Sequence, residues 1–142
     1  MTEPSDEIAF WLLVRQRSGG KPWLFVPLAM SDQITLALVP NTVATRSVIV
    51  PRAYSMLRTA GLLGANIYDI QTGRQSCVIS GATLGGQPIP NIETQVRDVE
   101  PFRNQSVEYA VDGYLGLDFL FGKCASLAIE TQTLRVRLRL RH

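Results

Sequence analysis

Two polar residues, Asn41 and Thr42, separate an apolar run that ends at Val39 from a second apolar run over Ser47–Val50. A short polar elbow between two buried runs is a position at which many folds hold a catalytic group. Asn41 carries an amide, which donates and accepts hydrogen bonds but does not ionise. The elbow therefore has the setting of an active site and lacks the acid that proton chemistry would need.

The other reactive side chains exclude several kinds of chemistry. The single histidine, His142, is the last residue, so a Ser–His or Cys–His pair has no base and a zinc site is short of ligands. Cys77 and Cys124 lie far apart in the sequence, which predicts two buried thiols rather than a disulfide framework. The glycines form neither a dinucleotide-binding fingerprint nor a phosphate loop. We therefore expect no metal and no cofactor.

Length and composition predict one soluble domain over residues 1–142, in which residues 1–21 form an N-terminal strand and turn. Hydrophobic residues make up 46% of the chain and charged residues 18%, enough apolar material for a core. The net charge of +2 is too small to indicate a nucleic-acid partner. No apolar run is long enough to cross a membrane, and the acidic start of the chain is unlike a secretory signal. We expect a cytoplasmic location.

The elements around the elbow are mostly strands. Apolar runs at 8–14, 23–30 and 34–39 predict a meander that leads into the elbow, and a strand at 47–50 leaves it. Further strands are expected at 67–70, 76–79, 82–84, 89–96, 109–111, 126–129 and 134–140, with turns at 17–21, 71–74 and 85–88 and a loop at 101–106. Many short strands with close turn signals predict a small, mostly antiparallel β-domain.

One segment predicts a true helix. It begins at Pro51, places Ala53, Met56, Leu57 and Ala60 on one face, and ends at Gly61, which is suited to a helix C-terminus. A shorter helical turn is expected over residues 117–122.

Two segments together resemble the retropepsin-like aspartic proteases, in particular the bacterial type. Residues 41–49, Asn-Thr-Val-Ala-Thr-Arg-Ser-Val-Ile, are similar to the family's active-site loop, Asp-Thr-Gly-Ala-Thr-x-Ser-hydrophobic-Ile. Residues 111–120 are similar to its second motif, Gly-hydrophobic-Leu-Gly-x-Asp-Phe-Leu. The order of the elements agrees from about Trp23 to Val136. The resemblance implies a retropepsin-like acid-protease barrel with one main helix and a flap formed by the hairpin near residue 70.

In that family two aspartates, one from each subunit of a dimer, share a proton and activate a water. In this chain Asn41 stands at the aspartate position, Thr42 retains the hydroxyl that anchors the two loops, and Val43 replaces a glycine. The resemblance implies that Val43 crowds a position at which any Cβ would intrude. It implies no intact catalytic residue, and a homodimer with two amides at its centre.

The same resemblance implies a cleft that takes a peptide or protein ligand. Asp112 and Asp118, in the second motif, are interpreted as a turn residue and a helix-start charge rather than as replacement acids. The binding residues that the resemblance implies belong to the loop, the flap and the second motif: Ala44, Thr45, Asp69, Ile70, Gln71, Thr72, Gly73, Tyr114, Leu115 and Gly116.

Two further patterns concern surfaces. The run 134–141 alternates aliphatic residues with Arg135, Arg137, Arg139 and Arg141, which predicts a half-exposed strand or, alternatively, an adhesive edge for an acidic partner or a second copy. The aromatic residues of the first two strands, Phe10, Trp11, Trp23 and Phe25, are expected to pack in the core or the N-terminal hairpin, with an exposed peptide-docking patch as the alternative.

Three functions remain open at this level. The first is a catalytically inactive retropepsin-like domain kept as a binding or dimerisation module. The second is an active homo- or heterodimeric aspartic endopeptidase, which requires that Asn41 is an engineered replacement of Asp or that a partner subunit supplies the Asp. The third is a structural or regulatory domain excised from a larger protein.

Overall fold

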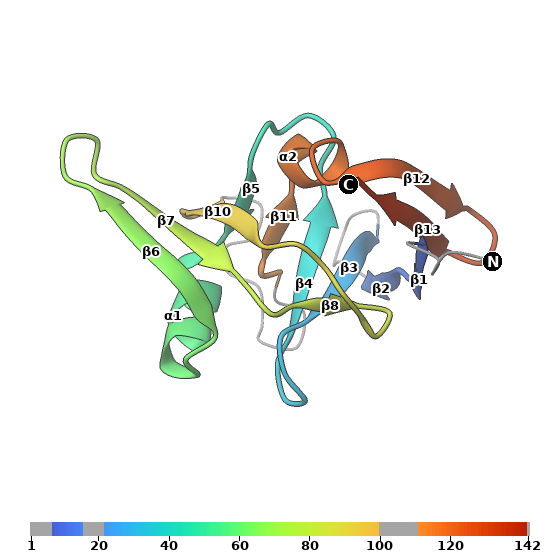
Figure 1. The fold of residues 1–142 in the computed structure, drawn as a ribbon, viewed down its shortest axis with the longest axis horizontal. Helices are drawn as coiled ribbons and strands as arrows, with labels where there is room; N and C mark the ends of the chain where they lie inside the picture. The colour runs from blue at the N-terminus through green and yellow to red at the C-terminus, as the bar shows by residue number, and fades with distance from the viewer. Residues whose placement is uncertain (1–6, 16–21, 100–110, 142) are drawn as a thin grey trace.

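The computed structural model describes residues 7–15, 22–99 and 111–141, and strands dominate it (Figure 1). The turn predicted at 17–21, the loop at 101–106, most of the strand at 109–111 and His142 lie outside the described residues. The strands are β1 (Glu7–Trp11), β2 (Leu13–Arg15), β3 (Trp23–Ala29), β4 (Thr35–Pro40), β5 (Ser47–Ile49), β6 (Leu63–Asp69), β7 (Arg74–Ile79), β8 (Thr83–Leu84), β9 (Gln87–Pro88), β10 (Ile92–Val96), β11 (Gly113–Leu115), β12 (Cys124–Glu130) and β13 (Arg135–Leu140). The helices are α1 (Pro51–Thr59) and α2 (Leu117–Leu120).

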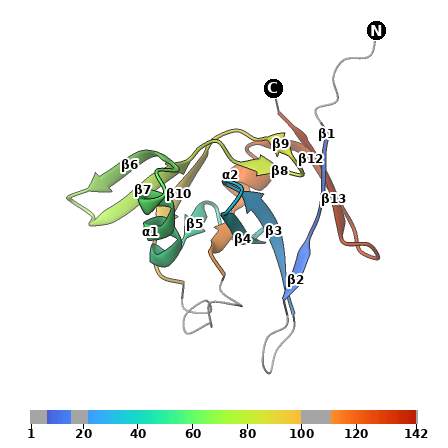
Figure 2. The same cartoon turned by 90° about the horizontal axis from the view of Figure 1, so that it is seen from below.

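The larger sheet runs in the order β6-β7-β10-β5-β11-β4-β3-β8-β9, and β2 pairs with β3. It curls around the core, and the β6–β7 hairpin extends sideways from it (Figures 1 and 2). Two neighbouring pairs are parallel, β4 with β11 and β5 with β10, and the remaining pairs are antiparallel. The elbow between β4 and β5 therefore lies at the centre of the sheet, where β11, which is far away in the sequence, is inserted between these two strands.

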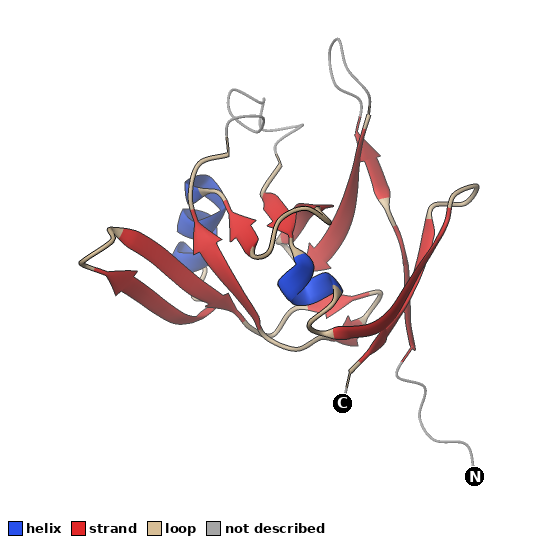
Figure 3. Cartoon of the chain, turned by 90° about the horizontal axis from the view of Figure 1, so that it is seen from above, coloured by secondary structure: helices blue, strands red, loops and turns tan. Residues whose placement is uncertain are grey.

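A second sheet of three strands, in the order β1-β13-β12, stands at the opposite end from the β6–β7 hairpin (Figure 3). The single strand predicted at 8–14 is wrong, because it divides into β1 in this sheet and β2 beside β3. The division falls at Leu12, whose backbone N–H donates to the carbonyl of Leu134 at 2.9 Å. The Arg-rich strand β13 is half-exposed, as predicted, and lies in the middle of the sheet, so the alternative that it forms an edge is wrong; the edges are β1 and β12.

Helix α1 confirms the predicted start and most of the predicted apolar face, although Ala60 is exposed and follows the last helical residue. Pro51 begins the helix, where its missing N–H breaks no intrahelical hydrogen bond. Ala53, Tyr54 and Leu57 are buried against the core. Gly61 follows with a φ of +70°, the left-handed conformation that favours glycine after a helix.

The core joins side chains from both sheets and both helices. Leu28, Leu36, Ile49, Leu57 and Leu84 are all fully buried. Of the four aromatic residues assigned to the core, Phe10 and Phe25 are buried and Trp23 is half-buried. Trp11 is 61% exposed, so the expectation that it packs in the core or the N-terminal hairpin is wrong for this residue; it faces outward because Phe10 takes the inward position on β1.

No helix among the described residues is long and apolar enough to span a lipid bilayer.

Candidate functional site

The elbow predicted from the sequence is a loop over residues 41–46 that links β4 to β5. The backbone N–H of Asn41 donates to the carbonyl of Leu115 at 2.8 Å, which continues the pairing of β4 with β11. The side-chain oxygen of Asn41 accepts the backbone N–H groups of Val43 at 3.0 Å and Ala44 at 3.2 Å. An amide oxygen and a carboxylate oxygen both serve as such an acceptor. The loop shape therefore does not depend on whether residue 41 is Asn or Asp.

The second motif holds this loop from the other side. The carbonyl of Ala44 accepts the N–H of Leu117 at 2.8 Å, and the carbonyl of Thr45 accepts that of Asp118 at 3.1 Å. Gly116 packs so closely that a Cβ would lie 2.6 Å from the carbonyl oxygen of Arg46. The two motifs that are about seventy residues apart in the sequence are thus one packed unit.

Asp118 is the main side-chain link in this unit. Its two carboxylate oxygens accept the hydroxyl of Ser47 at 2.7 Å and the backbone N–H of Ser47 at 3.0 Å. The N–H of Phe119 donates to the same carboxylate at 2.8 Å, and the Ser47 hydroxyl accepts the N–H of Gly116 at 3.0 Å. Asp118 lies in the first turn of α2, as expected from the sequence, and it also positions the loop from there.

Asp112 has a second structural role, beyond that of a turn residue. It is 6% exposed, and its carboxylate accepts the backbone N–H of Ala37 at 2.7 Å. The guanidinium of Arg52, in the first turn of α1, donates to the other oxygen at 2.7 Å. Asp112 therefore joins β4 to α1. Neither Asp112 nor Asp118 has an oxygen directed to the tip of the 41–46 loop.

Val43 is 88% exposed. Within the described part of the chain the loop tip turns this side chain away from the core, so the crowding that the resemblance implies stays a prediction. Thr42 is exposed as well, and Ala44 is half-buried. Any crowding at Val43 must come from a molecule that approaches the loop tip.

The predicted flap is the hairpin of β6 and β7, which is longer than the pattern at 67–70 and 76–79 indicated. Its tip, residues 69–73, is fully exposed, and Ile70 is 87% exposed. The tip projects away from the body in all three overall views, so this structure does not bring it over the 41–46 loop (Figures 1, 2 and 3). The middle of the hairpin, at Ile67 and Ser76, lines a cavity together with Arg46 at the end of the loop.

The hairpin tip carries a carboxylate that accepts several hydrogen bonds. The hydroxyl of Thr72 and the backbone N–H groups of Gln71 and Thr72 lower the pKa of Asp69 below its ordinary value of 3.8. A lowered pKa means that the folded hairpin binds this proton less readily than the unfolded chain does. Stabilisation of the turn is then complete above pH 3.8 and is lost as the pH falls through the lower folded value.

We expect the Asp69 carboxyl carbon, followed by NMR, to titrate below 3.8. The Thr72→Val variant should move that pKa back toward 3.8, because the hydroxyl makes the largest contribution. A titration of Asp69 at or above 3.8 in the native chain would contradict the turn geometry.

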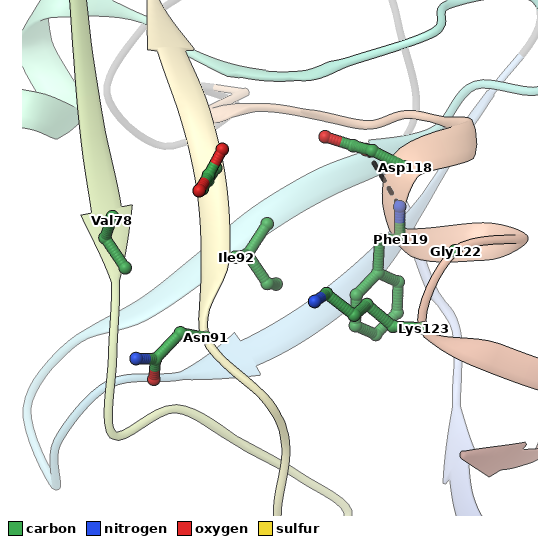
Figure 4. A pocket seen from close by; sticks show the side chains of 8 residues that line it. Val78, Asn91, Ile92, Asp118, Phe119, Gly122 and Lys123 are labelled. Atoms are coloured by element: carbon green, nitrogen blue, oxygen red, sulfur yellow. Dashed lines mark hydrogen bonds between the residues drawn. The ribbon is translucent and has the colours of Figure 1, made fainter. Parts of the chain in front are cut away.

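Two cavities follow β10, between the hairpin base and α2. The larger has a volume of about 520 Å³ and the smaller about 200 Å³, and both are lined by Val78 and Glu93. The larger reaches Asp118, Asn91 and Lys123, and Figure 4 shows Ile92 and Lys123 pointing toward one another across it. The residues that line the smaller are Arg46, Ile67, Ser76, Cys77, Val78, Glu93, Thr94 and Gln95. Together they form a groove from the end of the 41–46 loop to α2, with charges of both signs on its walls.

The second-motif residues assigned to binding are buried. Tyr114 is 7% exposed and Leu115 is 1% exposed, and Gly116 is packed against the loop backbone. The guanidinium of Arg97 donates to the Tyr114 hydroxyl and lies 5.9 Å from the centre of its ring. These residues therefore support the loop from the core side, and the carbonyls of Ala44 and Thr45 accept the N–H groups of the next two residues, Leu117 and Asp118.

Both cysteines are free and buried, as the sequence predicts. Burial raises the pKa of the Cys77 thiol, which lies 3.2 Å from the Thr94 hydroxyl, and burial also raises the pKa of Cys124. Raised values leave both thiols protonated at neutral pH and poor as nucleophiles. Within residues 7–15, 22–99 and 111–141, no group of three or more acidic, His or Cys side chains is placed to hold a metal ion.

Sequence reasoning missed several of these residues for different reasons. Ser47 and Asp118 both matched their motifs, so a pairing between the two motifs could have been inferred from the resemblance. The clamp between Arg52 and Asp112 had no local signal, because its partners are 60 residues apart. The groove residues Glu93 and Lys123 had no local signal either, because only the fold brings them to the same cavity.

Comparison with known proteins supports the fold. No family model matches the sequence, and no curated protein sequence matches it significantly. A retropepsin-like aspartic protease from Rickettsia conorii has a similar crystal structure, with a TM-score of 0.54 over 97% of this chain and 95% of that chain. The two sequences are 11% identical over this alignment, so the likeness concerns the fold. The retropepsin-like fold expected from the two motifs is confirmed.

Proposed function

We propose that this chain, which has a retropepsin-like fold, is a domain of residues 1–142 that does not cleave peptides and that binds an extended peptide or protein segment, as a homodimer. The observation that carries the proposal is the state of the 41–46 loop. Its shape is maintained by the Asn41 amide oxygen, whereas its side chains include no carboxylate. A fold that keeps the loop and lacks the acid keeps the binding geometry without the proton chemistry.

The nearby carboxylates support this interpretation. Asp118 accepts three hydrogen bonds from the loop and from α2, and Asp112 is enclosed beside Ala37 and Arg52. Moving either oxygen toward the loop tip would break contacts that hold the site together. The groove along β10 gives a bound segment a sheet strand to follow and charged walls for orientation.

One observation favours the alternative of an active aspartic endopeptidase. The hydrogen bonds of Asn41 to Val43 and Ala44 are those that a carboxylate at the same position would accept. If the natural residue is Asp, or if a partner chain supplies one, the loop is already shaped for it. The sequence of the native gene at codon 41 decides whether Asn41 is an engineered replacement of Asp.

The proposal is tested by incubating the purified chain with a denatured, alkylated protein substrate across acidic pH. We expect no cleavage above background. The Asn41→Asp variant should also remain inactive, since Val43 projects from the loop tip toward any approaching loop or substrate. Asn41→Asp with Val43→Gly should cleave more than the single variant. Native cleavage blocked by a pepstatin-type inhibitor would contradict the proposal, and equal activity of the single and double variants would remove the steric argument about Val43.

A further inference from the structure

The β12 edge of the three-stranded sheet has one feature that usually protects such an edge, a register shift between Cys124 and Ser126, and lacks most of the others. In the described residues β12 pairs with β13 on one side and with no strand on the other. Its residues from Ala125 to Ile129 include no charge and no proline. Folded proteins usually blunt an edge strand with Lys, Pro or an inward-pointing charge, because unpaired backbone groups recruit another strand. The five residues from Ala125 to Ile129 carry neither a charge nor a proline, so this part of the edge is suited to pairing.

The inner face of β12 is an incompletely covered apolar surface. Leu127 is 40% exposed and Ile129 is 45% exposed, although both face the core side of the sheet opposite the buried Leu138 and Val136. The cavity beneath them is lined by apolar side chains alone: Phe10, Leu12, Val26, Pro40, Leu84, Leu115, Phe119, Leu120, Leu127, Ile129, Val136 and Leu138. A strand added beside β12, with apolar residues at alternate positions, would cover both exposed side chains.

The outer face of the same sheet carries arginines on β13 and small side chains on β12. Arg139 lies opposite Ser126 of β12, and Arg137 lies opposite Ala128. Because these neighbours are small, the two guanidinium groups are not blocked on the β12 side. A shallow groove of about 460 Å³ is lined by both arginines together with Glu7, Ala125, Ser126, Ala128 and Leu138. Neighbouring strands are about 4.8 Å apart, so an added strand would lie within reach of a long arginine that crosses Ala128 or Ser126.

We propose that β12 binds an extended segment of another protein as an added strand, and that the segment alternates apolar with acidic residues. Its apolar side chains cover Leu127 and Ile129, its acidic side chains meet Arg137 and Arg139, and its backbone pairs with the free edge. The inference stands apart from the function proposed for the 41–46 loop, because β12 contributes no residue to the groove along β10.

Charge favours an acidic partner over a second copy of this chain. The outer faces of β13, β1 and β12 carry Arg135, Arg137 and Arg139 against Glu7 and Glu130. Glu130 already lies 3.7 Å from Arg137 and accepts the hydroxyl of Thr133, while Arg135 lies 5.6 Å from the Trp11 ring. A second copy would therefore add more positive than negative charge to this face, whereas an acidic strand compensates it.

The test uses the full chain and a ten-residue peptide that alternates Val and Glu, labelled for fluorescence anisotropy at low salt. We expect saturable binding that weakens as salt is added. Replacing each Glu of the peptide by Lys should remove binding. N-methylation of alternate amides, which keeps the charge and the apolar pattern, should also remove it if the peptide pairs as a strand.

Variants of the chain assign the site. Arg137→Gln with Arg139→Gln should weaken peptide binding at least about tenfold, as should Ile129→Lys, which places a charge on the inner face. Arg58→Gln with Arg74→Gln, which removes two exposed arginines from α1 and β7, is the control of equal net charge and should bind as the native chain does. Circular dichroism confirms that each variant is folded.

No binding by the native chain, or binding that the control variant weakens as much as the Arg137 and Arg139 variant, would overturn the proposal. A concentration-dependent dimer in sedimentation that Ile129→Lys abolishes would assign the edge to a second copy instead. None of these readouts depends on peptidase activity or on Asn41.

Discussion

The Gly113→Ala variant is expected to lose the folded state. Gly113 begins β11 with a φ of +156°, and a Cβ built there would lie 2.0 Å from the carbonyl oxygen of Val48 and 2.9 Å from the Cα of Ile49. Those atoms are backbone atoms of β5, which is held between β10 and β11, so they do not move aside as a flexible side chain would. We expect a loss of at least about 4 kcal/mol in the free energy of unfolding, in the range of the most damaging single substitutions.

The matched control is Gly86→Ala. Gly86 also has a positive φ, +80°, but no atom lies within 4 Å of the position of its Cβ. This variant should lose only the cost of a left-handed alanine, about 1–2 kcal/mol. Urea unfolding followed by circular dichroism compares the two, with soluble yield as a second measure for Gly113→Ala. Equal losses in the two variants would show that backbone conformation, rather than the approach of β11 to β5, decides the need for Gly113.

The Asp112→Ala variant is expected to lose about 3 kcal/mol of unfolding free energy. The substitution leaves the buried N–H of Ala37 without an acceptor and separates Arg52 from its carboxylate. An unsatisfied buried donor costs about 1–3 kcal/mol, and hydrogen bonds to charged groups contribute about 1.5–3 kcal/mol. The Arg52 side chain is 46% exposed, so water compensates part of its loss and the total stays in the lower part of the summed range.

Two further variants separate these contributions. Asp112→Asn keeps one acceptor oxygen for Ala37 and should lose about half as much as Asp112→Ala. Asp32→Ala removes an exposed aspartate from the turn before β4 and should change the free energy by less than about 0.5 kcal/mol. If Asp112→Ala proved as mild as Asp32→Ala in urea unfolding, the clamp between β4 and α1 would have no energetic role.

Local patterns predicted the elements that depend on neighbouring residues. The helix from Pro51, the strands on both sides of the elbow and the turn of helix at Leu117 were all found, because proline placement and apolar periodicity act within a few residues. The resemblance of two motifs supplied the fold, which the comparison with a solved structure confirmed.

Features that depend on strand order could not be predicted in the same way. The run at 8–14 reads as one strand, yet it divides at Leu12 because two different sheets pair with its halves. The alternation in β13 identified a half-exposed strand correctly. Only the pairing with β1 on one side and β12 on the other shows that it is the central strand of its sheet. The exposure of Val43 depends on how the loop turns after Asn41, a geometry that the motif alone does not give.

The parallel pairing of β4 with β11 also has a consequence for how the chain folds. It brings residues 38–40 beside residues 113–115, and the contact between Ser47 and Asp118 spans 71 residues. Closing loops of this length costs chain entropy before the new contacts repay it, and proteins rich in such distant pairs fold slowly. We therefore expect the contacts between the 41–46 loop and the second motif to form late in folding, whereas the β6–β7 hairpin and the β12–β13 hairpin need only residues close in sequence.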